Sequence, residues 1–316
     1  MKHFKISARW KQILLVISVI GLALLYSFDR YVQSSLNQAL TLPEPKLWTV
    51  QPGTSIRKLC RELKEKAIVE SCSGLKIAGR LKPEITKIQS GTYLLSPGMR
   101  FRDVLLRLNQ GKEHQFTFTI VEGENYFQVL DKVTEQAYLH DDVTLKPPAK
   151  LAQALGLDAV SPEGYFYPET YYYTANSSAL KLLQRAVEQQ KQILRTLWLS
   201  APKATVLSDP YDALILASII EKESAQQDER DVIASVFYNR LRKGMRLQTD
   251  PTVIYGVWSE YKGDITRQHM KRKTPYNTYR INGLPPTPIA NPSKASIQAA
   301  LNPATTDYFY FVASGE

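Results

Sequence analysis

The chain begins with a basic segment that is followed by an apolar one. Residues 1–11 carry four basic side chains and no acid, and from Gln12 to Phe28 no residue is charged. A helix of that length spans roughly 25 Å, within the range of a membrane-spanning segment. Because basic flanks stay on the cytoplasmic side, we expect a cytoplasmic tail at 1–12, a single-pass anchor at 13–28 and the body outside. A cleaved signal peptide is the alternative, although no small-x-small site follows the apolar run.

After the anchor, the pattern predicts a polar tether at 29–46 and then two similar strand–turn–helix units. In each unit an apolar stretch leads to a Pro-Gly turn, at 52–53 and 97–98, and then to an amphipathic helix. Together the units predict one small α+β module at 47–113. This module resembles the LysM-like modules of cell-wall proteins, which implies contact with glycan strands. A spacer that binds nothing is an equally open interpretation.

The module contains both cysteines of the chain, Cys60 and Cys72. Outside the cytoplasm they could form a disulfide, because their separation is easily closed. Cys60 also falls on the apolar stripe of an expected helix, where a buried free thiol is the commoner outcome. The sequence leaves both states open and favours the free thiols.

The remaining residues, 114–316, predict a larger domain that mixes strands and helices. An alternating run at 116–121 indicates a half-buried strand, and helices are expected at about 126–137 and 178–198. Between these helices, residues 163–173 contain six aromatic side chains on an expected strand. Such side chains either stack on sugar rings or pack into a core, and for most of the six the core is at least as well supported.

The helix that starts at Asp209 carries two glutamates near its end. Asp209 is a strong N-cap with proline at the first helical position. Glu221 continues the apolar face, and Glu223 lies about 200° away, so the two cannot form an acid/base pair from one face. Partial burial would raise the pKa of Glu221, as a general acid requires. The alternative is that Glu221 holds a buried arginine such as Arg240 or Arg246.

Downstream side chains are candidates for binding a sugar. Asn239 lies on the face of the next helix that also carries Val232 and Val236, which are expected to point inward. An amide at the rim of an apolar wall suits recognition of acetamido and hydroxyl groups. Other polar and aromatic candidates follow, each with a structural interpretation of equal weight: Gln248, Asp250, Tyr255, Tyr276 and Asn277.

Composition narrows the chemistry. A mean hydropathy of -0.27 excludes a polytopic membrane protein, and a net charge of +10, partly concentrated at the N-terminus, suits a membrane surface or an anionic polymer. The chain contains no dinucleotide-binding, Walker A or nucleophile-elbow motif, and its four histidines lack ligand spacing. We therefore expect no metal, no cofactor and no nucleic-acid partner.

The second half of the chain closely resembles one enzyme family. The matching runs are residues 221–224, 229–230, 234–241, 244–256, 276–279 and 283–292. They are similar to the signature of the endolytic murein transglycosylases (YceG-like family). The resemblance implies an enzyme of the cell inner membrane, with its body in the periplasm, that cuts nascent peptidoglycan strands internally and so limits their length. It also implies that Glu221 is the catalytic glutamate and that peptidoglycan synthases are possible partners.

A lytic transglycosylase needs only one carboxyl. Glu221 would protonate the glycosidic oxygen, the N-acetyl group would stabilise the oxocarbenium-like centre, and the 6-hydroxyl would close a 1,6-anhydro ring. This hypothesis requires Glu221 to lie half-buried at a groove, and an internal ion pair away from any groove would argue against it. The alternative of another class is a membrane-tethered murein-binding scaffold without catalysis. A hydrolase that releases reducing ends is a third interpretation.

The expected fold is therefore α+β, with an N-terminal transmembrane helix, a small LysM-like module, and a mixed α+β catalytic domain at 114–316 around a helix-borne glutamate. The proline-rich stretch 283–292 is expected to be a rigid loop that shapes a cleft wall. The family continues past this chain with a Gly-Gly-His-x-Phe turn, a strand and a helix. We therefore expect an apolar strand at 308–312, and either its partner is missing from this chain or another element covers its edge.

Overall fold

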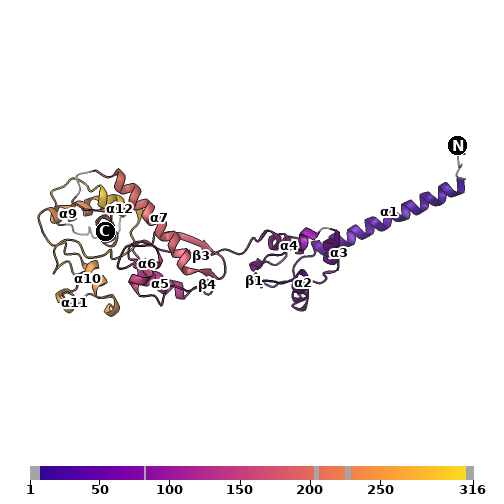
Figure 1. The fold of residues 1–316 in the computed structure, drawn as a ribbon, viewed down its shortest axis with the longest axis horizontal. Coiled ribbons are helices and arrows are strands. Elements are labelled where there is room, and N and C mark those ends of the chain that lie inside the picture. Colours follow the sequence, from indigo (N-terminus) through magenta and orange to yellow (C-terminus); the bar gives the residue numbers. More distant parts are fainter. Residues whose placement is uncertain (1–7, 82, 203–205, 225–228, 311–316) are drawn as a thin grey trace. The chain divides into compact units, whose positions relative to one another are not determined.

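The computed structural model describes residues 8–81, 83–202, 206–224 and 229–310. The chain divides into two compact units, Met1–Gln115 and Phe116–Glu316. Both units combine helices with short strands, so the predicted α+β class is confirmed (Figure 1).

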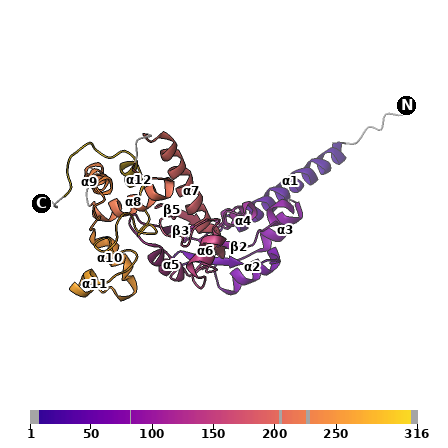
Figure 2. The ribbon, with the colours of Figure 1, turned by 60° about the vertical axis from the view of Figure 1, so that its left-hand side comes forward.

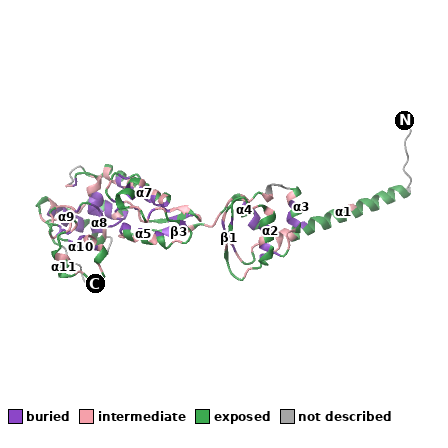
Figure 3. Ribbon diagram, turned by 60° about the horizontal axis from the view of Figure 1, so that its bottom comes forward, coloured by how far each residue is buried: buried purple, intermediate pink, exposed green. Residues whose placement is uncertain are grey.

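Helix α1 (Ala8–Asn37) is one uninterrupted helix. Among the described residues it alone is long and apolar enough to cross a membrane. Its side chains are exposed over most of its length, as Figure 3 shows, but Val32 is buried and Leu36 packs on the core of the first unit. The tether predicted at 29–46 therefore begins as packed helix, because Val32 and Leu36, one turn apart, continue an apolar face beyond the charged residues at 29 and 30.

The sheet of the first unit has two strands, β1 (Lys46–Val50) and β2 (Gly91–Leu95). They pair antiparallel, with Trp48 opposite Tyr93. Both of these aromatic side chains are buried, so the sheet forms one wall of the core of this unit.

A turn and a helix follow each strand, so both predicted strand–turn–helix units are present. The helices are α2 (Ile56–Glu65) and α4 (Phe101–Gln110), and the latter ends at Gly111 in the left-handed conformation (φ 63°). The sequence did not predict α3 (Ser73–Leu81) or the short 3-10 helix η1 (Pro83–Thr86), which lie in the chain between α2 and β2.

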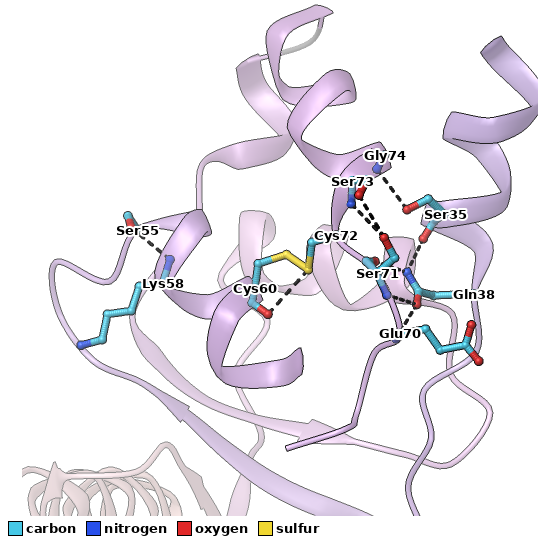
Figure 4. Close-up of a disulfide and its surroundings, with 10 residues drawn as sticks. All are labelled: Ser35, Gln38, Ser55, Lys58, Cys60, Glu70, Ser71, Cys72, Ser73 and Gly74. Carbon is cyan, nitrogen blue, oxygen red and sulfur yellow. Dashed lines mark hydrogen bonds between the residues drawn. A yellow bond between two sulfur atoms is a disulfide. The ribbon is translucent and has the colours of Figure 1, made fainter. Parts of the chain in front are cut away.

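A disulfide joins Cys60 to Cys72, as Figure 4 shows. Cys60 does lie on the buried stripe of α2, which is why the sequence favoured free thiols. That prediction is wrong, because the chain after α2 folds back and brings the Cα atom of Cys72 to 6.1 Å from that of Cys60. This separation lies within the normal range for a disulfide.

Two small pairs of strands open the second unit. The strand predicted at 116–121 is β3 (Phe116–Thr119), and it pairs antiparallel with β5 (Thr170–Tyr173). Only the last four residues of the aromatic run at 163–173 are therefore strand. Phe166, Tyr171 and Tyr173 are buried, whereas Tyr172 is exposed, so packing explains more of the run than sugar stacking does. The second pair is parallel and joins β4 (Leu139–His140) to β6 (Ser177–Ser178).

Three helices enclose the first core of this unit. They are α5 (Tyr126–Thr134), α6 (Pro148–Ala154) and the long α7 (Ala179–Ser200). Side chains from all three pack with β3 and β5. The segment 138–160, for which the sequence analysis predicted no element, contains β4 and α6.

The second core surrounds α8 (Pro210–Glu223), which is buried continuously from Ala213 to Ile220. Helices α9 (Arg230–Arg242) and α12 (Lys294–Leu301) pack against it, and α7 joins the two cores (Figure 2). Val232 at the start of α9 is 37% exposed rather than inward as predicted. Shorter elements complete the unit: α10 (Asp250–Gly256), η3 (Trp258–Glu260) and α11 (Arg267–Lys271).

Candidate active site

Glu221 lies in an internal ion pair near the end of α8. Arg230 Nη2 donates to Glu221 Oε1 at 3.2 Å, and the two side chains are only 8% and 5% exposed. The second oxygen, Oε2, accepts from the backbone N–H of Ser293 at 2.8 Å and from the Ser293 hydroxyl at 2.5 Å. Both oxygens are thus engaged, which matches the alternative in which Glu221 holds a buried arginine, with Arg230 as that arginine.

These contacts explain what Glu221 does for the fold. Ser293 is the N-cap of α12, so the carboxylate lies at the positive end of that helix. Arg230 is the first residue of α9. One carboxylate therefore joins three helices. The periodicity of α8 correctly placed Glu221 on the apolar face, but that face meets α9 and α12.

Glu223, the last residue of α8, has the electrostatic character that the sequence analysis sought in Glu221. It is half-buried, and burial raises the pKa of its carboxyl; the nearby Asp250 also raises it, while a hydrogen bond from Thr249 and the charge of Arg240 lower it. The Thr249 hydroxyl donates to Glu223 Oε1. A half-buried carboxyl that stays protonated closer to neutral pH is suited to donate a proton.

Two predicted residues flank Thr249 and so come close to Glu223. Asp250 is exposed at the start of α10, and the Tyr279 hydroxyl donates to its Oδ1 at 2.7 Å. Gln248 is exposed and has a φ of 50°, in the left-handed region that few non-glycine residues occupy. Its backbone N–H donates to the Thr278 carbonyl at 3.3 Å, which holds this conformation in place.

A pocket of about 250 Å³ lies beside the end of α8, next to Lys222. We call it the aromatic pocket, and its lining includes Asn125, Lys222, Tyr255, Trp258, Tyr261 and Ile289. Tyr255 was predicted, and Ile289 belongs to the proline-rich loop that was expected to shape a cleft wall. The sequence analysis missed Trp258 and Tyr261, although two aromatics three residues apart after α10 were the available signal. Their rings offer apolar faces of the kind that stack on sugars.

A buried carboxyl, Glu163, contacts Tyr255 in the wall of this pocket. It is 0% exposed and accepts from the backbone N–H groups of Tyr126 at 3.1 Å and Gly164 at 3.2 Å. Burial raises the pKa of Glu163 to about 8, although these hydrogen bonds and one from the Tyr255 side chain lower it. The centre of the Tyr255 ring lies 4.7 Å from that of Tyr276, so Glu163 and Tyr276 both hold Tyr255 in the wall of the aromatic pocket.

The comparison with known families decides what this chain is. Its residues 48–316 match the YceG-like family. The chain belongs to the YceG-like family.

Named relatives and a solved structure agree with this membership. An endolytic murein transglycosylase of Bacillus subtilis (strain 168) is 31% identical over 281 residues, which cover 84% of this chain and 77% of the relative. An endolytic murein transglycosylase of Streptococcus pneumoniae (strain R6) is 26% identical, and the chain spans about half (53%) of its length. The crystal structure of a yceG-like protein from Listeria monocytogenes has a TM-score of 0.53 and 31% identity, covering 86% of this chain and 95% of that one.

Three predicted residues of this YceG-like protein are engaged in holding its own chain. Asn239 Nδ2 donates to the carbonyls of Thr306 at 2.8 Å and Tyr308 at 2.9 Å. Asn277 is 1% exposed, and its Nδ2 donates to two backbone carbonyls of the 270–272 segment. The Tyr276 hydroxyl is hydrogen-bonded to Thr287 Oγ1 at 3.0 Å. The structural interpretation is favoured for all three.

The end of the YceG-like domain differs from the predicted strand. Tyr308, Phe309 and Tyr310 form no strand; residues 311 and 312 lie outside the described residues. Side chains of α9 explain the difference, because Arg240 Nε donates to the Phe309 carbonyl at 2.7 Å, and the Arg240 guanidinium lies 5.1 Å from the centre of the Tyr310 ring. Asn239 and Arg240 therefore bind the backbone carbonyls of Tyr308 and Phe309, which a partner strand would otherwise use.

Proposed function

We propose that this chain is an endolytic murein transglycosylase, a lyase that acts on peptidoglycan and is anchored in a membrane by α1. Membership of the YceG-like family and the names of its relatives support this activity. The observation that carries the proposal is the raised pKa of the half-buried Glu223 carboxyl, beside the 248–250 segment and on the same helix end as the aromatic pocket.

Glu223 is the better candidate for the proton donor. Glu221 would have to break its contacts with Arg230 and Ser293 before it could reach a substrate. Glu223 accepts a hydrogen bond from the Thr249 hydroxyl, and burial already favours its protonated form. Glu221, implied by the family resemblance, is the second candidate for the same role. An experiment must test whether its contacts with Arg230 and Ser293 open in the working enzyme.

In the proposed reaction the Glu223 carboxyl acts twice, first as an acid and then as a base. The carboxylic acid protonates the glycosidic oxygen as the bond from that oxygen to C1 of N-acetylmuramic acid breaks. The N-acetyl oxygen of the same sugar stabilises the positive charge at C1. The 6-hydroxyl then bonds to C1 and gives its proton to the Glu223 carboxylate, so that a 1,6-anhydro ring forms, no water is consumed and the acid is regenerated.

A muramidase is the second candidate function, and Asp250 is the observation that favours it. A two-carboxylate hydrolase needs a second acid near the first, and Asp250 is close enough to Glu223 to raise its pKa. In that case a water molecule would add to C1 and leave a reducing end. The two products differ by one water in mass, so mass spectrometry separates the hypotheses.

The cellular role follows from the position of the anchor. With the body in the periplasm of an inner membrane, the enzyme would meet nascent strands and terminate their elongation, and the synthases of these strands are its natural partners. The module at 47–113 would contact the glycan, and the domain at 114–316 would cut it.

The test uses the full chain in detergent micelles with purified sacculi. We expect anhydro ends in the digest from the native protein and from Glu188→Gln, a control at an exposed carboxyl of α7. Glu223→Gln should abolish them while glycan pull-down persists, and Glu221→Gln should keep them. Loss of product with Glu221→Gln alone, in a variant that melts like the native protein, would move the role to Glu221. Anhydro ends that neither change reduces would assign the proton donor to another residue, and a native protein that produces none would favour the scaffold.

A further inference from the structure

The first unit has an apolar pocket of about 480 Å³ that the proposed activity does not use. It lies between α1, α3, η1 and α4, and we call it the juxtamembrane pocket. Its apolar lining includes Val32 and Leu36 of α1, Ala78 and Leu81 of α3, and Leu105 and Leu106 of α4. Leu81 is 70% exposed and Leu106 is 54% exposed. The pocket is therefore bordered by two large apolar side chains that the described chain leaves open to solvent.

Helix α1 is firmly attached to this pocket. Ser35 Oγ accepts from the backbone N–H of Gly74 at 3.1 Å. Gln38 Oε1 accepts from the backbone N–H groups of Glu70 at 2.9 Å and Ser71 at 3.2 Å, and Figure 4 shows these bonds beside the disulfide. A Cβ atom at Gly74 would come within 2.5 Å of the Ser35 side chain, so α3 packs on α1 at a distance that only glycine allows. The pocket and the apolar part of α1 thus move as one piece.

The pocket lies at the height of lipid head groups if α1 spans the membrane. The apolar run ends at Phe28, and the first lining residue of the pocket is Asp29. From Asp29 to Leu36 the helix rises about 10 Å at about 1.5 Å per residue. The polar zone on each side of a bilayer is roughly 5–8 Å thick. The lower half of the pocket is therefore within the head-group zone.

Helix α3 brings an apolar tip and basic charges to the same level. Its start lies high on α1, since Ser71 contacts Gln38 and Gly74 contacts Ser35, whereas Leu81 at its end lines the pocket together with Asp29. The helix therefore runs back toward the membrane. It carries two basic side chains and no acid (Lys76 and Arg80), and both are exposed. An exposed leucine beside an arginine is the pattern of an interfacial contact, in which the stem packs on lipid and the charge meets phosphate.

We propose that the juxtamembrane pocket binds an anionic phospholipid of the leaflet that α1 enters, and that this lipid seats the first unit on the bilayer. An acyl chain occupies the apolar pocket, and Leu81 and Leu106 contact neighbouring chains. Among the lining residues Asp29 and Arg102 carry opposite charges, so the preference for an anionic lipid comes from Lys76 and Arg80. This inference rests on α1 spanning a membrane and is independent of the enzymatic activity.

The test places a fluorescent label at single sites of the full chain in vesicles of phosphatidylglycerol and phosphatidylcholine. Both native cysteines are disulfide-bonded, so one added cysteine carries the label. Leu81→Cys reports on the pocket, and Leu24→Cys reports on the span. Lys58→Cys on α2 is the exposed control, because it lies on the far side of the disulfide from α1 in Figure 4. Lipids with brominated acyl chains quench a label only where it touches them.

We expect brominated lipid to quench the label at 81 at least about twofold more than the label at 58, and more in phosphatidylglycerol than in phosphatidylcholine, because Lys76 and Arg80 attract the anionic head group. Leu106→Asp should reduce the quenching at 81 to the level at 58. Quenching at 24 with none at 81 would overturn the proposal while leaving the anchor intact. Equal quenching in both lipids would overturn the anionic ligand. No quenching at 24 would overturn the spanning helix and the proposal with it.

Discussion

The ion pair between Glu221 and Arg230 predicts that Glu221→Gln weakens the fold. The glutamine amide can keep hydrogen bonds to Ser293, so the main change is the loss of the negative charge beside Arg230. In the part of the chain that the structure describes, Nε and Nη1 of Arg230 have no hydrogen-bond partner, so Glu221 is the contact that compensates this buried charge. Removing one partner of a buried pair costs about 3–5 kcal/mol.

Thermal unfolding measures this cost. For a unit of about 200 residues, Phe116–Glu316, each kcal/mol shifts the Tm by roughly 2–4 °C, so we expect a fall of about 6–20 °C. The control is Glu188→Gln, whose pair with Lys191 is exposed and worth about 0–1 kcal/mol. The double variant Glu221→Leu with Arg230→Met should recover most of the loss, because apolar replacement of a buried pair is often neutral.

One result would refute the reasoning. If Glu221→Gln melted like the native protein but made no product, the carboxylate would be dispensable for folding and required for chemistry. Glu221 would then be the acid, and the contacts with Arg230 and Ser293 would have to open in the working enzyme.

Three further predictions follow from the contacts described. Glu163 has a pKa of about 8 in the fold and an ordinary one near 4.5 when unfolded, so the folded state holds the extra proton. Stability should fall by up to about 1.4 kcal/mol per pH unit from pH 4.5 to 8, and Glu163→Gln should flatten that slope in urea titrations. Replacing Cys60 and Cys72 by alanine should cost the first unit about 3 kcal/mol in calorimetry, given the twelve-residue separation. Asp209→Ala removes the hydrogen bond to the Asp212 N–H at the start of α8 and should cost about 1 kcal/mol; no change in urea midpoint would show that the cap is redundant.

Local signals predicted helices and their ends well. Asp209 caps α8 as predicted, because an N-cap acts within its own turn of chain. Periodicity also placed Glu221 on the buried face of its helix. Periodicity could not show which element covers that face, because the covering residue, Arg230, belongs to another helix, α9.

The same limit applies to the site. Helix geometry places Glu223 opposite Glu221 and gives no sign of its environment, yet burial in the folded chain raises the pKa of its carboxyl. Glu163 looked like one residue of an aromatic strand, and its burial depends on α5 and α10 closing over it. Burial of a polar side chain is decided by distant elements, so a single sequence shows where such a residue stands on its own helix or strand and no more.

The continuity of α1 has a mechanical consequence. The helix enters the first unit without a break and is hydrogen-bonded there through Ser35 and Gln38. The apolar part of α1 is therefore joined to the rest of the first unit by continuous helix. A transmembrane helix leans to match the thickness of its bilayer. If α1 spans a membrane, as we propose, it should tilt further in a thinner bilayer, and the rest of the first unit should tilt by the same angle.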